Sequence, residues 1–311
     1  MHNYITIDGG TTNTRINLVI NEKIVDTLKF NIGARNGING NLEFKATLKN
    51  GITDILNKNC VAESDIYRIL ASGMITSEFG LYEVPHTVAP AGIELLHSNM
   101  KEVLINDVSD IPFVFISGIR TEGTLEQTDM MRGEETEIIG LAEKYSTNAV
   151  YVLPGSHSKI VEFDSENRIS HFTTAMSGEM IAALSGNTIL KDAVDLSVDK
   201  FDSEYLLLGY EIAEKLGIAQ ALFKTRILKN LFKKDKCQVY SFFLGVILFS
   251  DIQTIKNSQN STVVIGGKNS LKNSLAYLLE QKTEKEIICA EETDVEECIS
   301  IGAIKIYEYS N

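Results

Sequence analysis

The first thirty residues contain the feature that most restricts how this chain can fold. Three short runs rich in Ile, Val, Leu and Thr occupy residues 4–8, 14–20 and 23–30, and only a Gly-Gly-Thr-Thr turn and an Asn-Glu step interrupt them. Such runs with tight turns between them predict an antiparallel meander of three strands. A helical pattern at 42–57 and a strand pattern at 66–71 follow. The first part of the chain is therefore expected to be an α/β layer with a mixed sheet.

A similar opening recurs at residue 149. There NAVYVLPGSHSKIVEF predicts strand, glycine turn and strand, and ISHFTTA predicts a third strand. Apolar residues spaced by three or four predict helices over 178–250, and the end of the chain predicts strand (STVVIGG), helix (271–281), strand (286–290) and helix (295–307). Two similar openings suggest an internal duplication, and 311 residues are enough for two domains.

Composition narrows the classes of function. With 44% apolar and 23% charged residues, the chain has the composition of a soluble globular enzyme. Its formal charge of −13 argues against a nucleic-acid or anionic-membrane partner, because phosphate backbones need a basic footprint. The first residues carry no signal-peptide pattern, and the apolar run at 242–249 is too short to span a bilayer. The four cysteines show no zinc-site spacing, so we expect reduced thiols and a cytoplasmic protein.

The turn between the first two strands has the chemistry of a phosphate site. It consists of Asp8, Gly9, Gly10, Thr11, Thr12 and Asn13. The two glycines permit positive φ and leave no side chain between backbone and ligand, so that successive N–H groups can converge on an anion. The threonines and the asparagine add neutral donors, and the aspartate can anchor a hydrated Mg²⁺. The alternative is an ordinary hairpin whose residues were selected for turn propensity.

Two further elements follow in an order typical of one class of ATP-binding protein. The chain has no Walker A sequence and no Rossmann fingerprint, so ATP would bind by the hairpin mode of the actin, hexokinase and Hsp70 class. PGSHSK can be a second phosphate hairpin, and VVIGGKNSL resembles the adenosine-binding element of that class. The cofactor-binding residues expected from these two elements are Gly155, Ser156, His157, Lys159, Gly266 and Gly267.

Together these segments resemble a family. IDGGTTNTR, SGM (72–74), MRGEETEIIG (131–140), LPGSHSK (153–159) and MSGEM (176–180) look like a 2-dehydro-3-deoxygalactonokinase over essentially the whole chain. MRGEET followed by PG-[ST]-H-x-K is the most specific part. The resemblance implies two ribonuclease H-like, actin-like ATPase domains around a nucleotide cleft. It also implies phosphorylation of the terminal (6-) hydroxyl of 2-dehydro-3-deoxy-D-galactonate in galactonate catabolism, with ATP and Mg²⁺. Gly9 stands where the family usually has Trp.

Phosphoryl transfer needs positioning, a metal and a base for the attacking hydroxyl. Acidic residues crowd the start of a predicted helix shortly before the PGSH turn, a place comparable to that of the catalytic aspartate in hexokinase-like enzymes. We therefore predict Glu134 or Glu135 as the base, with Asp8 as the metal ligand. The alternative is that these acids only complement the helix dipole. Spacing does not choose between the two glutamates.

The remaining predictions concern substrate and organisation. Arg132 lies inside the signature and could bind the substrate carboxylate, as could Arg35 or Arg120. We expect one domain over 1–125, joined by the C-terminal helix 296–311, and a second over 126–295, with a homodimer as the default assembly. The alternatives are a kinase of the same superfamily for another sugar acid or sugar, or a non-catalytic sensor. The acids retained at both predicted sites argue against the sensor.

Overall fold

The computed structural model describes residues 2–35, 42–267 and 271–309. The chain divides into two compact units. The first comprises Met1–Thr147, Phe163–His171 and Glu292–Asn311, and the second comprises Asn148–Glu162 and Phe172–Glu291. The domain boundary that we placed after residue 125 falls inside the first unit, because the helix that starts at Glu134 packs against the C-terminal helix.

A six-stranded sheet organises the first unit, in the order β3-β2-β1-β4-β7-β6. Its strands are β1 (Asn3–Gly9), β2 (Thr14–Ile20), β3 (Lys23–Phe30), β4 (Ile66–Gly73), β6 (Lys101–Val103) and β7 (Phe113–Phe115). The antiparallel pairs β1–β2 and β2–β3 confirm the predicted meander, while β4 and β7 continue the sheet in parallel. A small second sheet contains β5 (Thr87–Val88), β8 (Ile119–Arg120) and β9 (Met130–Met131).

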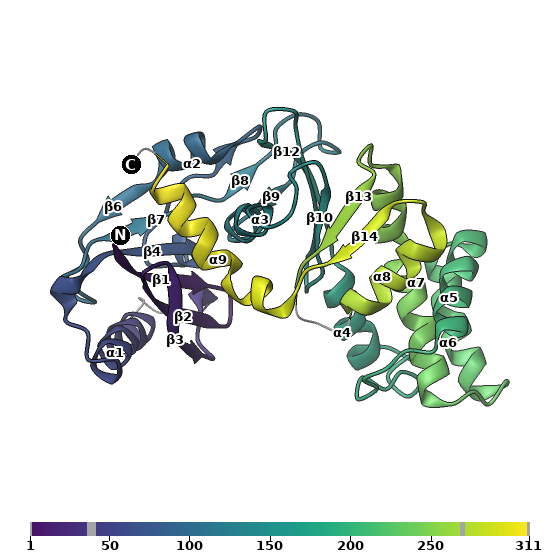
Figure 1. Ribbon diagram of the computed structural model, residues 1–311. Coiled ribbons are helices and arrows are strands. Elements are labelled where there is room, and N and C mark those ends of the chain that lie inside the picture. The colour runs from purple at the N-terminus through teal and green to yellow at the C-terminus, as the bar shows by residue number, and fades with distance from the viewer. Residues whose placement is uncertain (1, 36–41, 268–270, 310–311) are drawn as a thin grey trace. The chain divides into compact units, whose positions relative to one another are not determined.

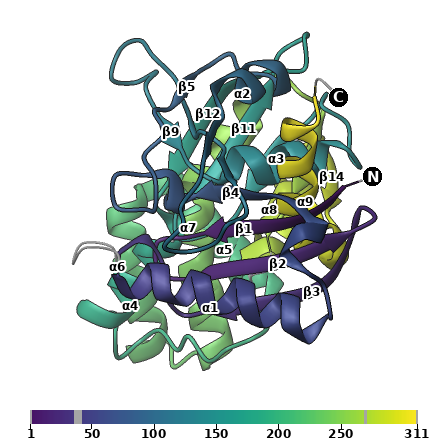
Figure 2. The ribbon, with the colours of Figure 1, turned by 90° about the vertical axis from the view of Figure 1, so that its left-hand side faces the viewer.

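The two faces of the large sheet differ in chemistry. Helix α1 (Leu42–Lys58) packs along β2 and β3 on the face that buries Ile5 and Ile7 (Figure 2). Helix α9 (Glu292–Tyr307) crosses the other face (Figure 1), which carries polar side chains. There Ser300 Oγ lies 2.6 Å from Thr6 Oγ1 and accepts from Asn17 Nδ2 at 2.9 Å. These mutual hydrogen bonds compensate for the burial of the polar groups.

Helix α3 (Glu134–Ala142) packs so closely on α9 that only glycine fits at the crossing. A Cβ added to Gly140 would lie 1.8 Å from the Cys298 carbonyl oxygen, and one added to Gly302 would lie 2.0 Å from that of Thr136. The short helix α2 (Ile93–Asn99) also contacts α9. The position of α3, which begins with the two candidate glutamates, is thus set by the C-terminal end of the chain.

The second unit repeats the strand plan of the first. Its sheet has the order β12-β11-β10-β13-β14. The strands are β10 (Val150–Leu153), β11 (Ser158–Phe163), β12 (Ile169–Ala175), β13 (Thr262–Ile265) and β14 (Glu286–Cys289). As with β2, β1, β4 and β7, an antiparallel hairpin of β10 and β11 is followed by two parallel strands. This common order is what a duplication would leave.

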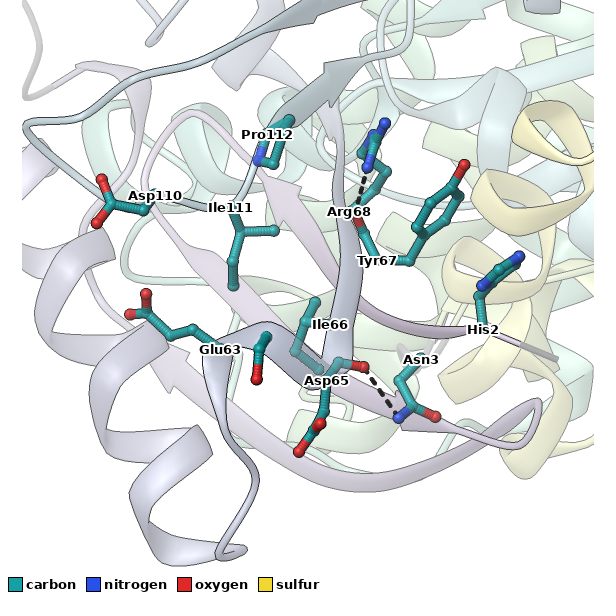
Figure 3. Close-up of a pocket in the computed structure, with 11 residues that line it drawn as sticks. His2, Asn3, Glu63, Asp65, Ile66, Tyr67, Arg68, Asp110, Ile111 and Pro112 are labelled. Atoms are coloured by element: carbon teal, nitrogen blue, oxygen red, sulfur yellow. Dashed lines mark hydrogen bonds between the residues drawn. The ribbon is translucent and has the colours of Figure 1, made fainter.

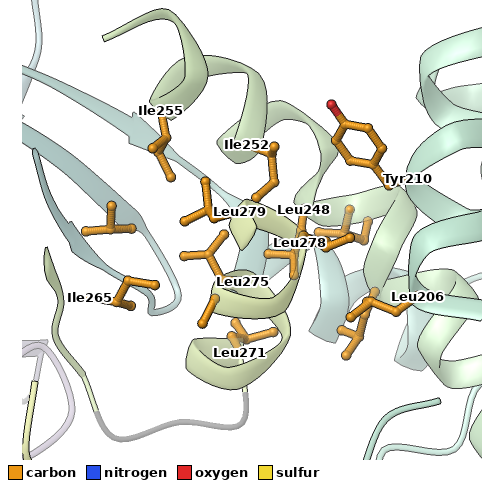
Figure 4. Packing of buried hydrophobic residues seen from close by; sticks show 14 of the residues in the cluster. Leu206, Tyr210, Leu248, Ile252, Ile255, Ile265, Leu271, Leu275, Leu278 and Leu279 are labelled. Carbon is orange, nitrogen blue, oxygen red and sulfur yellow. The ribbon is translucent and has the colours of Figure 1, made fainter. Parts of the chain in front are cut away.

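Helices bury the apolar face of this second sheet. They are α4 (Ser177–Asn187), α5 (Ser203–Leu216), α7 (Lys236–Asn257) and α8 (Leu271–Lys282), while α6 (Ile218–Asn230) packs on α5 and α7. Figure 4 shows Leu206 of α5, Leu248 of α7 and Leu275 of α8 in one cluster with Ile265 of β13. By length and composition α7 could cross a bilayer, but 72% of its most apolar stretch is buried in the unit, as in a core helix.

Candidate active site

The predicted first phosphate turn joins β1 to β2. Gly10 N–H donates to the Asn13 carbonyl at 2.8 Å and closes the turn, whose side chains from Thr11 to Asn13 are exposed. The following segment lies against it, because Ala34 N–H donates to the Gly10 carbonyl and Arg35 N–H donates to that of Thr11, each at 3.0 Å. Arg35 is exposed beside the turn. Its predicted contact with substrate stays a prediction.

Three glycines bring the end of β1, the end of β4 and the start of α3 into backbone contact. Gly73 has φ 87°, and a Cβ there would lie 2.7 Å from the Gly9 carbonyl oxygen. Gly133 has φ 109°, and a Cβ there would lie 3.0 Å from Gly73 Cα. Residues with a side chain rarely adopt such φ values, and an added Cβ would clash at Gly73 and crowd its neighbour at Gly133. The contact places Asp8, beside Gly9, near Glu134, beside Gly133.

Gly9 also has a local reason to lack a side chain. A Cβ at this position would lie 2.5 Å from Ile75 Cβ. Any larger residue, including the Trp that the resemblance leads one to expect, would require Ile75 to move. The glycine is therefore matched to its neighbour in this chain.

Asp8 lies at the carboxyl end of β1, in register with Arg15 of β2 and Ser72 of β4. Part of its surface is exposed, yet the surrounding protein desolvates the carboxyl, and this burial raises its pKa. The Arg15 guanidinium opposes the shift, and the nearby Glu134 charge adds to it. Burial disfavours the ionised form of the Asp8 carboxyl, and a bound cation would stabilise that form.

The adjacent glutamates have different surroundings. Glu135 is fully buried, and its two carboxyl oxygens accept from Gly133 N–H at 2.9 and 2.8 Å. Burial, followed by the Glu134 charge, raises the pKa of Glu135 to about 8. Glu134 is only half-buried, and its Oε2 accepts from Arg132 N–H at 2.9 Å. Glu134 is thus accessible from outside α3, whereas Glu135 is turned toward the protein.

Arg132 is held by the segment that follows β4. Its Nη1 donates to the Thr76 carbonyl at 2.7 Å, to Thr76 Oγ1 at 2.6 Å and to the Val84 carbonyl at 3.1 Å. Its Nη2 lies 3.2 Å from His86 Nδ1. Within the described ranges no carboxylate lies within ion-pair distance of this guanidinium. The predicted role of Arg132 in substrate binding stays a prediction, and sequence reasoning did not identify His86.

The predicted second phosphate turn joins β10 to β11, and the start of α4 packs against it. A Cβ at Gly178 would lie 2.3 Å from the Gly155 carbonyl oxygen, and Glu179 N–H donates to the Ser156 carbonyl at 3.1 Å. His157 is exposed, with Nε2 3.3 Å from Glu179 Oε1. An exposed turn beside a helix amino terminus offers several N–H groups to an anion.

A buried carboxylate anchors this helix start. Ser177 Oγ donates to Asp251 Oδ1 and Oδ2, at 2.7 and 2.8 Å. Burial raises the pKa of Asp251 to about 6, and the hydroxyls of Ser177 and Ser158 oppose the shift. Sequence reasoning did not identify Asp251, although it is the one acidic residue of the apolar helix α7.

The remaining predicted nucleotide residues also lie in the second unit. Lys159 is buried, and its Nζ donates to Thr174 Oγ1 of the neighbouring strand β12 at 2.6 Å. Gly266 N–H donates to the Val152 carbonyl at 2.8 Å, and Gly267 has φ 77°. The strand end that carries these glycines thus lies beside the strand that enters the second turn. Residues 268–270 of the predicted adenosine element lie outside the described residues.

A separate pocket of about 560 Å³ lies elsewhere in the first unit (Figure 3). It lies at the amino-terminal ends of β1 and β4, and its lining includes Asn3, Glu63, Tyr67 and Asp110. The His2 ring stacks on that of Tyr67 with centroids 4.1 Å apart. Since β1 leads from this pocket to the phosphate turn, the two are roughly 20 Å apart. The pocket contains none of the predicted site residues.

Comparison with known proteins places these features in context. A sequence model of the 2-keto-3-deoxy-galactonokinase family matches residues 8–303. The chain is 25% identical over 268 residues to the 2-dehydro-3-deoxygalactonokinase of Escherichia coli (strain K12), covering 85% of each chain. A solved structure of a proposed 2-dehydro-3-deoxygalactonokinase from Sinorhizobium meliloti is 20% identical, with a TM-score of 0.80 over 98% of each chain.

A more distant likeness bears on the fold alone. The activator of 2-hydroxyisocaproyl-CoA dehydratase from Clostridium difficile, solved with ADPNP, is 14% identical with a TM-score of 0.53, over 98% of this chain and 95% of that one. With the repeated strand order, this likeness confirms the predicted fold class, an α/β actin-like ATPase fold of two domains.

Proposed function

Because the chain belongs to the 2-keto-3-deoxy-galactonokinase family, we propose that it transfers the γ-phosphoryl group of ATP to the terminal (6-) hydroxyl of 2-dehydro-3-deoxy-D-galactonate. The observation that carries the proposal is the backbone contact of Gly9, Gly73 and Gly133. It brings the Asp8 carboxylate, beside a turn suited to phosphate, close to Glu134 at the start of α3. A kinase needs this combination of anion site, metal ligand and base.

We assign the base to Glu134. Its Oε2 is oriented by the Arg132 N–H, and the carboxylate is accessible enough to meet a substrate hydroxyl. As the hydroxyl oxygen bonds to the γ-phosphorus and the bond to the ADP oxygen breaks, the hydroxyl proton passes to Glu134. Glu135 has a supporting role, because its carboxyl is buried and holds Gly133 N–H at the first turn of α3.

The donor set near the first turn fits a magnesium ion. Mg²⁺ is usually held by one or two carboxylates together with water and phosphate oxygens. Asp8 would hold it, with Glu134 close enough to raise the pKa of Asp8. No group of three or more metal-binding side chains occurs among residues 2–35, 42–267 and 271–309. When bound, the ion neutralises charge on the transferring phosphoryl group.

The other residues that we predict to bind ATP lie in the second unit. The backbone of Gly155, Ser156 and His157 would bind phosphate oxygens together with the amino terminus of α4, where the helix dipole favours an anion. Gly266 and Gly267 would let the nucleoside lie against the backbone. ATP itself follows from membership of a family of ATP-dependent kinases.

The test is a coupled ADP-release assay with ATP and Mg²⁺ on a panel of 2-keto-3-deoxy sugar acids, aldonates and hexoses. Glu134→Gln and Glu135→Gln form a matched pair, since each replaces a carboxyl group by an amide of the same size at neighbouring positions. We expect turnover with 2-dehydro-3-deoxygalactonate, with kcat lowered about 100-fold or more only in Glu134→Gln. Turnover with another sugar alone would mean that this sugar, and not 2-dehydro-3-deoxygalactonate, is the substrate. ATP binding without any turnover would favour the sensor.

A further inference from the structure

The Arg132 guanidinium is a fixed charge whose pKa is lowered by burial, and the carboxyls of Glu135 and Glu83 oppose that shift only from beyond ion-pair distance. Its Nη1 has three oxygen acceptors on Thr76 and Val84, which clamp the side chain in place. These acceptors are neutral, and no described carboxylate forms an ion pair with the group. A half-buried cation with neutral partners attracts an anionic ligand more strongly than an exposed one, because water screens it less.

The same guanidinium sets the tautomer of His86. An arginine can only donate, so the Nδ1 atom, 3.2 Å from Arg132 Nη2, must be the unprotonated acceptor. The proton of the neutral ring is then on Nε2. Burial and the charges of Arg132 and Arg120 lower the pKa of His86 to about 4, so the ring stays neutral at physiological pH. No described residue accepts a hydrogen bond from Nε2.

The histidine lies beside the proposed reaction centre. The point where a Cβ on Gly118 would stand is 2.9 Å from His86 Cδ2 and 3.2 Å from Arg132 Cα. Arg132 also donates its backbone N–H to Glu134, while its guanidinium lies at the other end of the same side chain. The base and the Arg132–His86 pair are thus separated by up to the length of an arginine side chain. A six-carbon sugar acid carries its terminal hydroxyl and its carboxylate at opposite ends of a chain of similar length.

We propose that His86 and Arg132 form the subsite that recognises the carboxylate of the sugar acid, with His86 Nε2–H donating to a carboxylate oxygen. The inference rests on the proposed function, and it assigns the enzyme's selectivity for sugar acids over neutral sugars to these two residues. Arg132 supplies the charge, and His86, held in one tautomer, supplies a donor with a defined direction. His86 would then contact substrate while playing no part in binding ATP.

Two substitutions distinguish the role of the Nδ1 atom of His86 from that of its Nε2 atom. The His86→Asn amide reaches the position of Nδ1, so it can keep the contact with Arg132 but loses the Nε2 donor. The longer His86→Gln side chain can place an N–H near the position of Nε2. We expect His86→Asn to raise KM for the sugar acid about 10- to 100-fold, the size of a hydrogen bond to a charged group, with KM for ATP and Tm near wild type. His86→Gln should recover part of the loss.

The primary amide of the sugar acid is the matched ligand. Wild type should prefer the acid to the amide by about 10-fold or more, and His86→Asn should reduce that preference. An unchanged preference in His86→Asn would overturn the inference while leaving the kinase assignment intact. A wild-type enzyme that phosphorylates only neutral sugars would instead remove the proposed function and, with it, the carboxylate subsite.

Nitrogen-15 NMR of wild-type histidines tests the proposal without any variant. The His86 signals should show the Nε2–H tautomer in the free protein, and the Nε2–H proton should shift on titration with sugar acid but not with ATP alone. An Nδ1–H tautomer, or an Nε2–H signal unmoved at saturating sugar acid, would contradict the assignment.

Discussion

Replacing Glu135 with Gln separates the two adjacent glutamates by stability as well as by rate. Glu135 is fully buried, and its carboxyl accepts hydrogen bonds from Gly133 N–H and from the neighbouring Thr136 hydroxyl. Because burial raises its pKa from 4.5 to about 8, the carboxyl is protonated in most folded molecules at pH 7. Glutamine keeps the size and neutrality of that protonated form but cannot ionise.

The magnitude follows from the linkage between pKa and folding. An acid with a raised folded pKa contributes stability that is fully present below its unfolded pKa and is lost as the pH rises toward its folded value. For Glu135 the loss runs from pH 4.5 to about 8. Between pH 5 and 7 it lowers the unfolding free energy of wild type relative to Glu135→Gln by about 2.5 kcal/mol, at 1.36 kcal/mol per pKa unit.

The assay is urea unfolding of wild type and Glu135→Gln at pH 5, 6, 7 and 8, followed by circular dichroism. Hydrogen exchange of the α3 amides identifies the transition in which the first unit unfolds. Any constant difference from altered hydrogen bonding cancels, since only the change of the difference with pH is used. Curves that stay parallel from pH 5 to 8 would refute the reasoning, because they would mean that Glu135 titrates alike in both states.

Five other substitutions test separate parts of the structure. Asp8→Asn should lower kcat about 100-fold or more and raise the Mg²⁺ concentration for half-maximal rate, and an unchanged Mg²⁺ dependence would exclude Asp8 as ligand. Lys159→Met should raise KM for ATP about 10-fold, with KM for the sugar acid as the internal control. Asp251→Ala should lower the free energy of unfolding in urea by about 1–3 kcal/mol, because it leaves the buried Ser177 hydroxyl without its acceptor. A smaller decrease would mean that water replaces the carboxylate. Gly73→Ala should lower the free energy of unfolding by about 1–3 kcal/mol, because Gly73 has a φ of 87°. Gly186→Ala should raise it by about 0.5–1 kcal/mol, because the added Cβ has no neighbour within 4 Å. Similar melting temperatures for the two variants would contradict the strain argument.

Local sequence patterns predicted much of the architecture, because its hairpins form between strands that are adjacent in the sequence. Alternating β-branched residues with glycine turns between them were enough to predict the meander β1–β3 and the hairpin β10–β11. The predicted helix at 42–57 corresponds to α1, and the acidic run after Gly133 marked the start of α3. Each of these features depends on residues close in sequence, so backbone propensity and turn chemistry determine them.

The assignment of site residues depended on contacts between distant segments. Sequence could not choose between Glu134 and Glu135, because successive residues of a helix point about 100° apart and the direction of burial is set by what the helix packs against. Here that partner is α9, more than 150 residues away in the sequence. The same holds for Asp251, which is buried against Ser177 of another helix, and for His86, whose tautomer is set by Arg132. The sequence alone thus determined the fold and the location of the site, and tertiary packing decided which of its polar side chains are accessible to a ligand.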